Sequence, residues 1–152
     1  MKDQLKQLAF AIRLAALAHK DQTDKAGEVY ILHPLTVMEA VAPNVPAMTI
    51  AVLHDVIEDT DVTEAYLRSE GFDPLIVDVV AILTRRKDEE YSRYIRRVAE
   101  ANGYPGMLAR AVKRADLEDN LAPERLEKLD TLTRSKMRLK YEPALERVRD
   151  AQ

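Results

Sequence analysis

The feature that most constrains this chain is the segment HDVIEDT at residues 54–60, where four ionisable side chains follow an apolar stretch. The apolar residues before and within it recur at helical spacing, which predicts one helix through the segment, with His54 above Glu58 and Asp55 above Asp59. Burying these charges without partners would cost several kcal/mol per ion. The segment therefore predicts a bound cation or a wet cleft, and the alternative is a solvated acidic helix end.

Length and composition favour one soluble domain, which we expect to span residues 1–152. The 47% of apolar residues can build a substantial core. The absence of cysteine excludes disulfides and thiolate metal sites and fits a cytoplasmic protein. A formal net charge of −3 argues against nucleic-acid binding, and no stretch approaches the ~20 apolar residues of a membrane span. We expect a small-molecule ligand, no nucleic acid and no membrane, with a homo-oligomer left open.

Helical periodicity recurs along the whole chain, and proline, glycine and capping residues separate the periodic segments. No convincing strand or repeat is found, so the expected fold class is all-α, a single-domain helical bundle with short connections. The expected helices cover 3–19, 35–42, the stretch from Pro46 through 54–60, 61–68, 74–84, 91–101, 107–121 and further periodic residues towards the C-terminus.

Histidine and aspartate residues from three separated segments suggest a metal site. His33 is expected at the N-cap of the second helix, His54 and Asp55 are adjacent, and Asp116 interrupts the inward face of the predicted helix 107–121. A single histidine is more often a hydrogen-bonded core or cap residue, but the joint occurrence favours a metal. A mixed nitrogen and oxygen set favours Mn²⁺, with Fe²⁺, Zn²⁺ and Mg²⁺ as alternatives.

Other polar residues have roles that the sequence leaves open. Glu58 and Asp59 are placed to take a proton from water or to hold it in line, and the alternative is an acidic helix end. His19 is expected at a helix C-terminus or beside a ligand that it orients. Tyr141 fits a core position as well as a base-stacking one. The candidate phosphate contacts, most of them individually more typical of solvated surface, are Lys25, Arg85, Arg86, Lys87, Lys113 and Arg114.

Three runs in this order resemble the HD phosphohydrolase superfamily, and more closely its RelA/SpoT-type hydrolase domains and small alarmone hydrolases. The runs are KAGEVYILHP at 25–34, HDVIEDT at 54–60 and ADLEDNL at 115–121. The His-Asp pair alone would be a weak signal, but the three runs together are specific. The resemblance covers roughly residues 19–141 and implies a helical bundle of the HD-domain type.

The resemblance also implies a reaction, the removal of the 3′-pyrophosphate from (p)ppGpp or a related nucleotide to leave GDP or GTP and pyrophosphate. Hydrolysis would depend on Mn²⁺. The implied roles are metal ligation by His33, His54, Asp55 and Asp116, water activation or positioning by Glu58 and Asp59, and nucleotide contacts by Lys25, Asn120 and Tyr141.

The chain departs from the family pattern at two places that bear on the base. Relatives usually carry a basic residue just before the lysine, where it helps to hold the base, and here that residue is Asp24. An acid at this position favours adenine, as in (p)ppApp, as an alternative to guanine. The chain continues after Asn120 as Leu121-Ala122-Pro123, without the arginine common in relatives.

Two other functions compete with alarmone hydrolysis. The first is a generic HD-type nucleotidase or phosphodiesterase that acts on a simpler phosphate ester. The second is a non-catalytic module that binds a nucleotide or a protein partner, with a vestigial site. The second alternative predicts broken motifs, whereas every expected ligand and water-handling residue is present.

Overall fold

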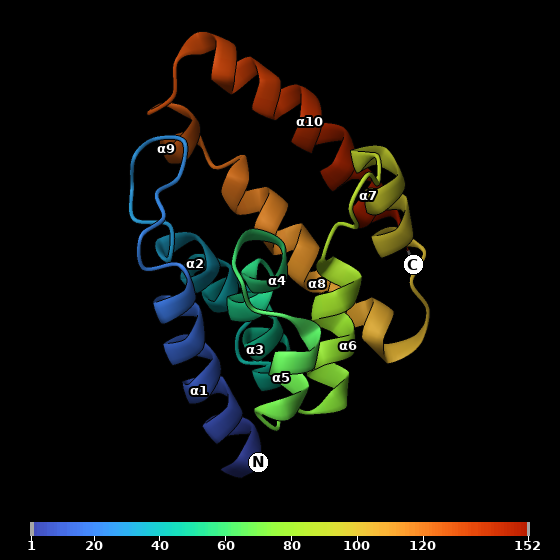
Figure 1. The fold of residues 1–152 in the computed structure, drawn as a ribbon. Helices are drawn as coiled ribbons and strands as arrows, with labels where there is room; N and C mark the ends of the chain where they lie inside the picture. The colour runs from blue at the N-terminus through green and yellow to red at the C-terminus, as the bar shows by residue number, and fades with distance from the viewer. Residues whose placement is uncertain (1, 152) are drawn as a thin grey trace.

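In the computed structural model, which describes residues 2–151, helices dominate, and within that range the only extended pairing is an isolated bridge between Thr23 and Val29 (Figure 1). The expected all-α fold is confirmed. None of the described helices is both long and apolar enough to cross a membrane. The helices are α1 (Lys2–Ala18), α2 (Leu32–Ala40), α3 (Val45–Leu53), α4 (Val56–Asp59), α5 (Glu64–Ser69), α6 (Pro74–Leu83), α7 (Tyr91–Ala99), α8 (Gly103–Asn120), α9 (Pro123–Leu126) and α10 (Thr131–Asp150).

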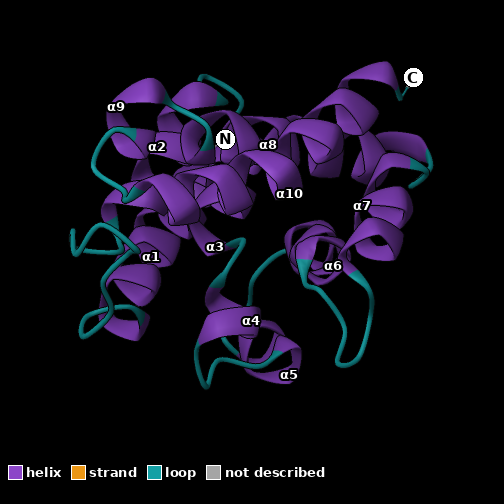
Figure 2. Ribbon diagram, turned by 90° about the horizontal axis from the view of Figure 1, so that it is seen from above, coloured by secondary structure: helices purple, strands orange, loops and turns teal. Residues whose placement is uncertain are grey.

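Helix α3 forms the centre of the bundle and contacts α1, α2, α6 and α8. Nearly all its residues from Ala47 to Leu53 are buried, as expected for a helix that is apolar on every side. The long helix α8 packs against α2, α6, α7 and α10, and α10 runs alongside it (Figures 1 and 2). Helices α3 and α8 therefore form the inner layer on which the functional residues are mounted.

Local capping explains where two of the inner helices begin. The Asn44 side chain accepts a hydrogen bond from the Ala47 N–H, and α3 has a proline in its first turn. Asp73 accepts from the Leu75 N–H at the start of α6, which confirms the helix predicted after Asp73. Helix α5 begins later than the predicted helix 61–68, because the Thr63 side chain accepts a hydrogen bond from the Tyr66 N–H and caps the helix there.

The predicted continuous helix through the 54–60 segment is wrong. Helix α3 ends at Leu53 and the short α4 begins at Val56, with His54 and Asp55 in the turn between them. Consecutive residues in a helix point about 100° apart. His54 Nε2 and Asp55 Oδ2 nevertheless lie 3.0 Å apart, and the Asp59 N–H still bonds the Asp55 carbonyl one turn earlier, as the predicted pairing of these two aspartates requires.

Two other predicted boundaries are also wrong. Helix α2 begins at Leu32, and its N-cap is Ile31, so His33 lies inside the first turn and not at the N-cap. Helix α8 begins at Gly103, four residues before the start of the predicted helix 107–121. A proline is compatible with the first turn of a helix because its missing N–H would have no partner there.

We expect the substitution Gly106→Ala to destabilise the protein, although alanine is normally the better helix former. A Cβ atom added at Gly106 would lie 1.9 Å from the carbonyl oxygen of Ala101, in the connection between α7 and α8. The free energy of unfolding, measured by urea denaturation, should fall by about 1–3 kcal/mol, as for other overpacked sites. The control Ser135→Ala, at an exposed position of α10, should change it by less than about 0.5 kcal/mol. A Gly106→Ala protein as stable as the wild type would contradict the close packing.

Candidate functional site

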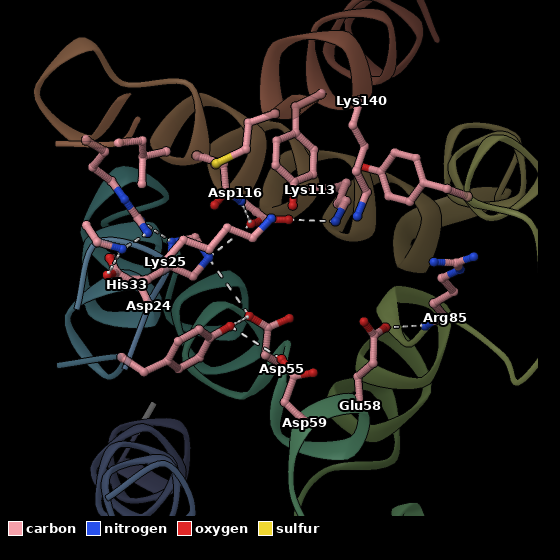
Figure 3. Close-up of a pocket in the computed structure, with 18 of the residues that line it drawn as sticks. Asp24, Lys25, His33, Asp55, Glu58, Asp59, Arg85, Lys113, Asp116 and Lys140 are labelled. Carbon is pink, nitrogen blue, oxygen red and sulfur yellow. Dashed lines mark hydrogen bonds and ion pairs between the residues drawn. The ribbon is translucent and has the colours of Figure 1, made fainter. Parts of the chain in front are cut away.

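The predicted site residues gather around one cavity of about 270 Å³ (Figure 3). The cavity is bordered by the loop before α2, the turn between α3 and α4, the connection between α6 and α7, and by α8, α9 and α10. His54 lies behind the lining, against Asp116. The predicted residues that line the cavity are Lys25, His33, Asp55, Glu58, Asp59, Asp116, Asn120 and Tyr141.

The four predicted metal ligands turn their donor atoms towards one another. Asp116 Oδ1 lies 3.0 Å from His33 Nε2 and 3.6 Å from His54 Nε2, and these three residues form a group with the spacing of a metal site. Asp55 Oδ2 lies 3.0 Å from His54 Nε2 and 3.9 Å from His33 Nε2. Two imidazoles and two carboxylates from α2, α8 and the turn between α3 and α4 thus border one point.

Hydrogen bonds on the far side of each ring select the tautomer that a metal ion needs. His54 Nδ1 donates to the Ala51 carbonyl oxygen at 2.6 Å, and His33 Nδ1 donates to Asp119 Oδ2 at 2.6 Å. In the neutral form of each ring, Nε2 then carries the lone pair, and this atom faces the carboxylates. His54 Nε2 is buried and has no hydrogen-bond partner. A buried lone pair beside two carboxylates fits a divalent cation that accepts nitrogen and oxygen ligands.

The electrostatics of this cluster also favour a positive charge. Burial opposes protonation of His33 and His54, but the facing carboxylates outweigh it and raise the pKa of both rings. Burial likewise opposes ionisation of Asp116, yet the Lys113 ammonium and the two rings hold the pKa of this carboxyl well below its usual range. The negative charge of the Asp55 and Asp116 carboxylates is concentrated in a low-dielectric site, and a cation bound between them would stabilise it.

The Asp116 carboxylate is fixed from two sides. Lys113 Nζ, which is buried, donates to its Oδ2 at 2.6 Å, and Asn120 Nδ2 donates to its Oδ1 at 2.7 Å. Asn120 was predicted to contact the nucleotide. The structure places it at the cavity and also engages it with a predicted metal ligand, so both roles are available to it.

The carboxyl groups of Glu58 and Asp59 border the cavity from α4. Glu58 Oε1 accepts a hydrogen bond from the Arg85 N–H at 2.7 Å, which connects α4 to the segment after α6. Partial burial raises the pKa of Glu58, and the Arg85 N–H offsets part of this effect. Partial burial and the Asp55 carboxylate raise the pKa of Asp59. Both carboxyls are therefore suited to exchange protons closer to neutral pH than free carboxylic acids do.

Tyr30 supports the same carboxylates and was missed by the sequence analysis, because a tyrosine in a loop carries no periodic signal. Its hydroxyl donates to Asp55 Oδ2 at 2.5 Å and lies 3.4 Å from Asp59 Oδ2. Its ring packs on the fully buried His19, whose Nδ1 bonds Gln22 Oε1 at 2.8 Å. The Gln22 amide donates to the Asp59 carbonyl at 2.8 Å. His19 thus braces α4 through Gln22 instead of touching a predicted metal ligand.

Arg125 is the second group that sequence reasoning missed. Its guanidinium pairs with Asp119 through Nη1 and with Asp24 Oδ2 through Nη2 at 3.2 Å. Asp24 Oδ1 in turn accepts the N–H groups of Ala26 and Glu28. Folding therefore places the Arg125 guanidinium next to the acidic residue at position 24. A separation of 101 residues hides this pairing from any local pattern.

One end of the cavity is apolar, and basic side chains line other parts of it. Leu129 and Met137 line the apolar end, where Ala26 and Tyr141 pack against the same small hydrophobic cluster. Tyr141 is half-buried and also faces the cavity, so its two predicted roles are compatible. Of the six basic residues predicted as phosphate contacts, Lys25, Arg85 and Lys113 line the cavity, and Arg86, Lys87 and Arg114 do not.

The geometry predicts that Mn²⁺ stabilises the folded protein through the four-residue cluster. Because a ligand that binds only the folded state raises its stability, the melting temperature should rise as Mn²⁺ is added. Asp55→Ala should abolish this rise, and calorimetric titration should detect no tight Mn²⁺ binding. The control Asp61→Ala, at an exposed position outside the cavity, should respond like the wild type. An unchanged Mn²⁺ response in Asp55→Ala would rule out this residue as a ligand.

Glu58 should make the metal-free protein less stable as pH rises. Because the folded state raises its pKa, the folded protein binds more protons than the unfolded chain between the ordinary and the raised value, and stability falls as pH increases through that window. The melting temperature of Glu58→Gln relative to the wild type, measured in chelator, should increase across the same window. The control Glu39→Gln, on the exposed face of α2, should not show this trend. A constant difference would contradict the raised pKa.

No protein-family model matches the chain. It is 43% identical over 65 residues to the bifunctional (p)ppGpp synthase/hydrolase SpoT of Escherichia coli K12, a match that covers 41% of this chain and 9% of that protein. It is 32% identical over 115 residues to the guanosine-3′,5′-bis(diphosphate) 3′-pyrophosphohydrolase of Vibrio cholerae, covering 72% of this chain and 16% of that protein. The matched region is thus a small part of each relative.

The fold is also found in a solved structure described as a metazoan ortholog of SpoT that hydrolyzes ppGpp and plays a role in starvation responses. The two structures superpose with a TM-score of 0.78 over 96% of this chain and 87% of the other, at 23% sequence identity. At this identity the likeness establishes the shared fold. In sequence and in fold, the chain resembles the HD-domain hydrolases of the RelA/SpoT type.

Proposed function

We propose that this chain is a metal-dependent hydrolase that removes the 3′-pyrophosphate from an alarmone nucleotide such as (p)ppGpp or (p)ppApp. The observation that carries the proposal is the convergence of His33, His54, Asp55 and Asp116 beside a cavity with free carboxyl groups and cations. The names of the curated relatives, which are ppGpp pyrophosphohydrolases, support the same reaction.

The proposed cofactor is Mn²⁺, held by the two Nε2 atoms and by the carboxylates of Asp55 and Asp116. The buried and unpartnered Nε2 of His54 and the Asp119 hydrogen bond to His33 support this ligand set. A divalent cation bound there would supply Lewis-acid chemistry, because it stabilises negative charge on phosphoryl oxygens. The donor set admits other divalent cations, and Mn²⁺ suits its mixture of imidazole and carboxylate.

Glu58 and Asp59 would manage the protons and the position of water. Hydrolysis forms a bond from the water oxygen to phosphorus and breaks the bond from phosphorus to the nucleoside 3′ oxygen. The water loses a proton, and the 3′ oxygen gains one as it leaves. Carboxyl groups with raised pKa values fit both transfers, because each spends part of its time in the protonated form closer to neutral pH.

The nucleoside would extend from the metal cluster towards the apolar end of the cavity. Tyr141 and Met137 offer surfaces for a base there, and Lys25 and Asn120 lie between the base and the metal cluster as candidate nucleotide contacts. This orientation would place the scissile phosphate near Asp116. It would also direct the phosphate groups away from the hydrophobic cluster.

The identity of the base depends on Asp24 and Arg125. Asp24 engages both carboxylate oxygens inside the protein, with two backbone N–H groups and with Arg125, so it is poorly placed to read a base directly. Arginine donors match the O6 and N7 acceptors of guanine. Both Nη atoms of Arg125 are paired with Asp119 and Asp24, so this match requires the base to compete with one of these carboxylates, and the acidic residue at position 24 is the reason to keep adenine as the alternative. A cytoplasmic location and homo-oligomer formation stay predictions.

The decisive assay compares ppGpp and ppApp side by side and measures Mn²⁺-dependent release of pyrophosphate. The wild type should release pyrophosphate from at least one of them, and chelator should stop the reaction. Glu58→Gln should lower kcat by about 100-fold or more while Mn²⁺ still raises its melting temperature, because it removes a proton-handling group and no metal ligand. The control Glu39→Gln should keep full activity.

The same assay separates the competing functions. Hydrolysis of simple phosphate esters without release of pyrophosphate from either alarmone would support a generic phosphodiesterase. Nucleotide binding without any turnover would support a binding module. Full activity of Glu58→Gln would remove this residue from the proposed mechanism.

A further inference from the structure

Part of the cavity, here called the cationic wall, is lined by basic side chains. Lys25, Arg85 and Lys140 border it, and among residues 2–151 none of the three has a carboxylate oxygen within ion-pair distance. Arg85 Nε is satisfied by a carbonyl oxygen, that of Glu89, which leaves its charge unneutralised. Acidic and basic side chains are balanced over the cavity as a whole, so what distinguishes these three cations is the lack of an ion-pair partner within the described part of the chain.

The Lys140 ammonium group makes cation–π contacts with two tyrosine rings at this wall. Its Nζ lies 4.5 Å from the centre of the Tyr91 ring and 5.1 Å from the centre of the Tyr141 ring, within the range of cation–π contacts. The rings come from α7 and from the next residue of α10. The ammonium group therefore lies at the cavity beside two aromatic rings, with no carboxylate of the described residues within ion-pair distance.

The neighbouring cations act on Lys140 together. Partial burial, followed by repulsion from Lys25, Arg85 and Lys113, lowers the pKa of Lys140, and the Glu58 carboxylate offsets part of this effect. Figure 3 shows Lys113 and Lys140 projecting from α8 and α10 towards the same part of the cavity, with Arg85 at its border. An anion bound between these basic groups would reduce the repulsion among them.

Asp116 separates this wall from the metal cluster. Its Oδ1 faces the histidine rings, and its Oδ2 accepts the hydrogen bond from Lys113 Nζ. An anion bound at the wall would therefore be close to the metal cluster, with only the Asp116 carboxylate between the two. That arrangement fits a ligand with more than one phosphate group.

We propose that Lys140 and Arg85, the two cations beside Lys113 that have no carboxylate partner in the described structure, form a second phosphate subsite, which holds a phosphate group other than the one that is attacked. The inference rests on the proposed function and extends it, because it makes the wall a determinant of substrate choice. Two groups of an alarmone have the required chemistry. They are the outer phosphate of the 3′-diphosphate and the diphosphate on the 5′ oxygen.

The test is the substitution Lys140→Met, which removes the charge and keeps an unbranched apolar stem beside the tyrosine rings. The KM for ppGpp should rise by about tenfold or more with a smaller change in kcat, because charge-assisted contacts to a bound group are lost. The matched control is Lys136→Met, one turn earlier on α10, at an exposed position outside the cavity. A KM for Lys140→Met equal to that of the control would overturn the proposal.

A second substrate identifies the group that is held. Guanosine 3′-diphosphate has the outer 3′ phosphate and lacks the 5′ phosphates. An equal rise in KM for both substrates assigns the wall to the outer 3′ phosphate, and a rise confined to ppGpp assigns it to the 5′-diphosphate. Either result supports the subsite.

A binding measurement without turnover keeps this proposal separate from the proposed reaction. Inorganic pyrophosphate should bind the wild type and Lys136→Met in chelator, measured by calorimetry, and its affinity for Lys140→Met should fall by about tenfold or more. If the wild type hydrolyses no alarmone but shows this pattern, the subsite stands and the proposed reaction fails. If alarmones are hydrolysed while Lys140→Met binds pyrophosphate as tightly as the control, the subsite is wrong and the reaction stands.

Discussion

The carboxylate of Asp116 is the interaction on which the rest of the cavity depends. Two imidazoles face one of its oxygens, the Lys113 ammonium binds the other, and Asn120 fixes its orientation. Removing this one negative charge would leave a buried lysine unpaired and two rings without their common acceptor. Such an uncompensated buried charge is among the most costly defects in a protein interior. The carboxylate therefore serves the fold and the proposed chemistry at the same time.

The bundle supplies the rigidity that this carboxylate needs. Helix α3 is buried almost all round and ends at the turn that presents His54 and Asp55, while α8 carries Lys113 and Asp116 across the other helices. A residue on such an element can move little, because the interior is closely packed on every side. Loop residues complete the cavity at its edge, where a ligand enters and adjustment is tolerated.

Helical periodicity was sufficient to predict the all-α fold and most helices, and residue chemistry was sufficient to select the four predicted metal ligands. Periodicity could not find the turn at His54 and Asp55, because apolar residues continue on both sides of it. Periodicity also could not identify the roles of Arg125, Tyr30 and Lys140. Their roles come from partners in other elements, such as Asp24 for the arginine, and these contacts arise only when the helices pack.

The bridge between Asp24 and Arg125 has a consequence for how sequences of this kind can diverge. Arg125 pairs with Asp24 and also with Asp119, which is the hydrogen-bond partner of His33. A basic side chain at position 24 would repel the guanidinium across the mouth of the cavity, and loss of the guanidinium would leave two acids facing each other. Positions 24 and 125 are thus expected to covary, with a change of charge at one tolerated chiefly when the other changes as well.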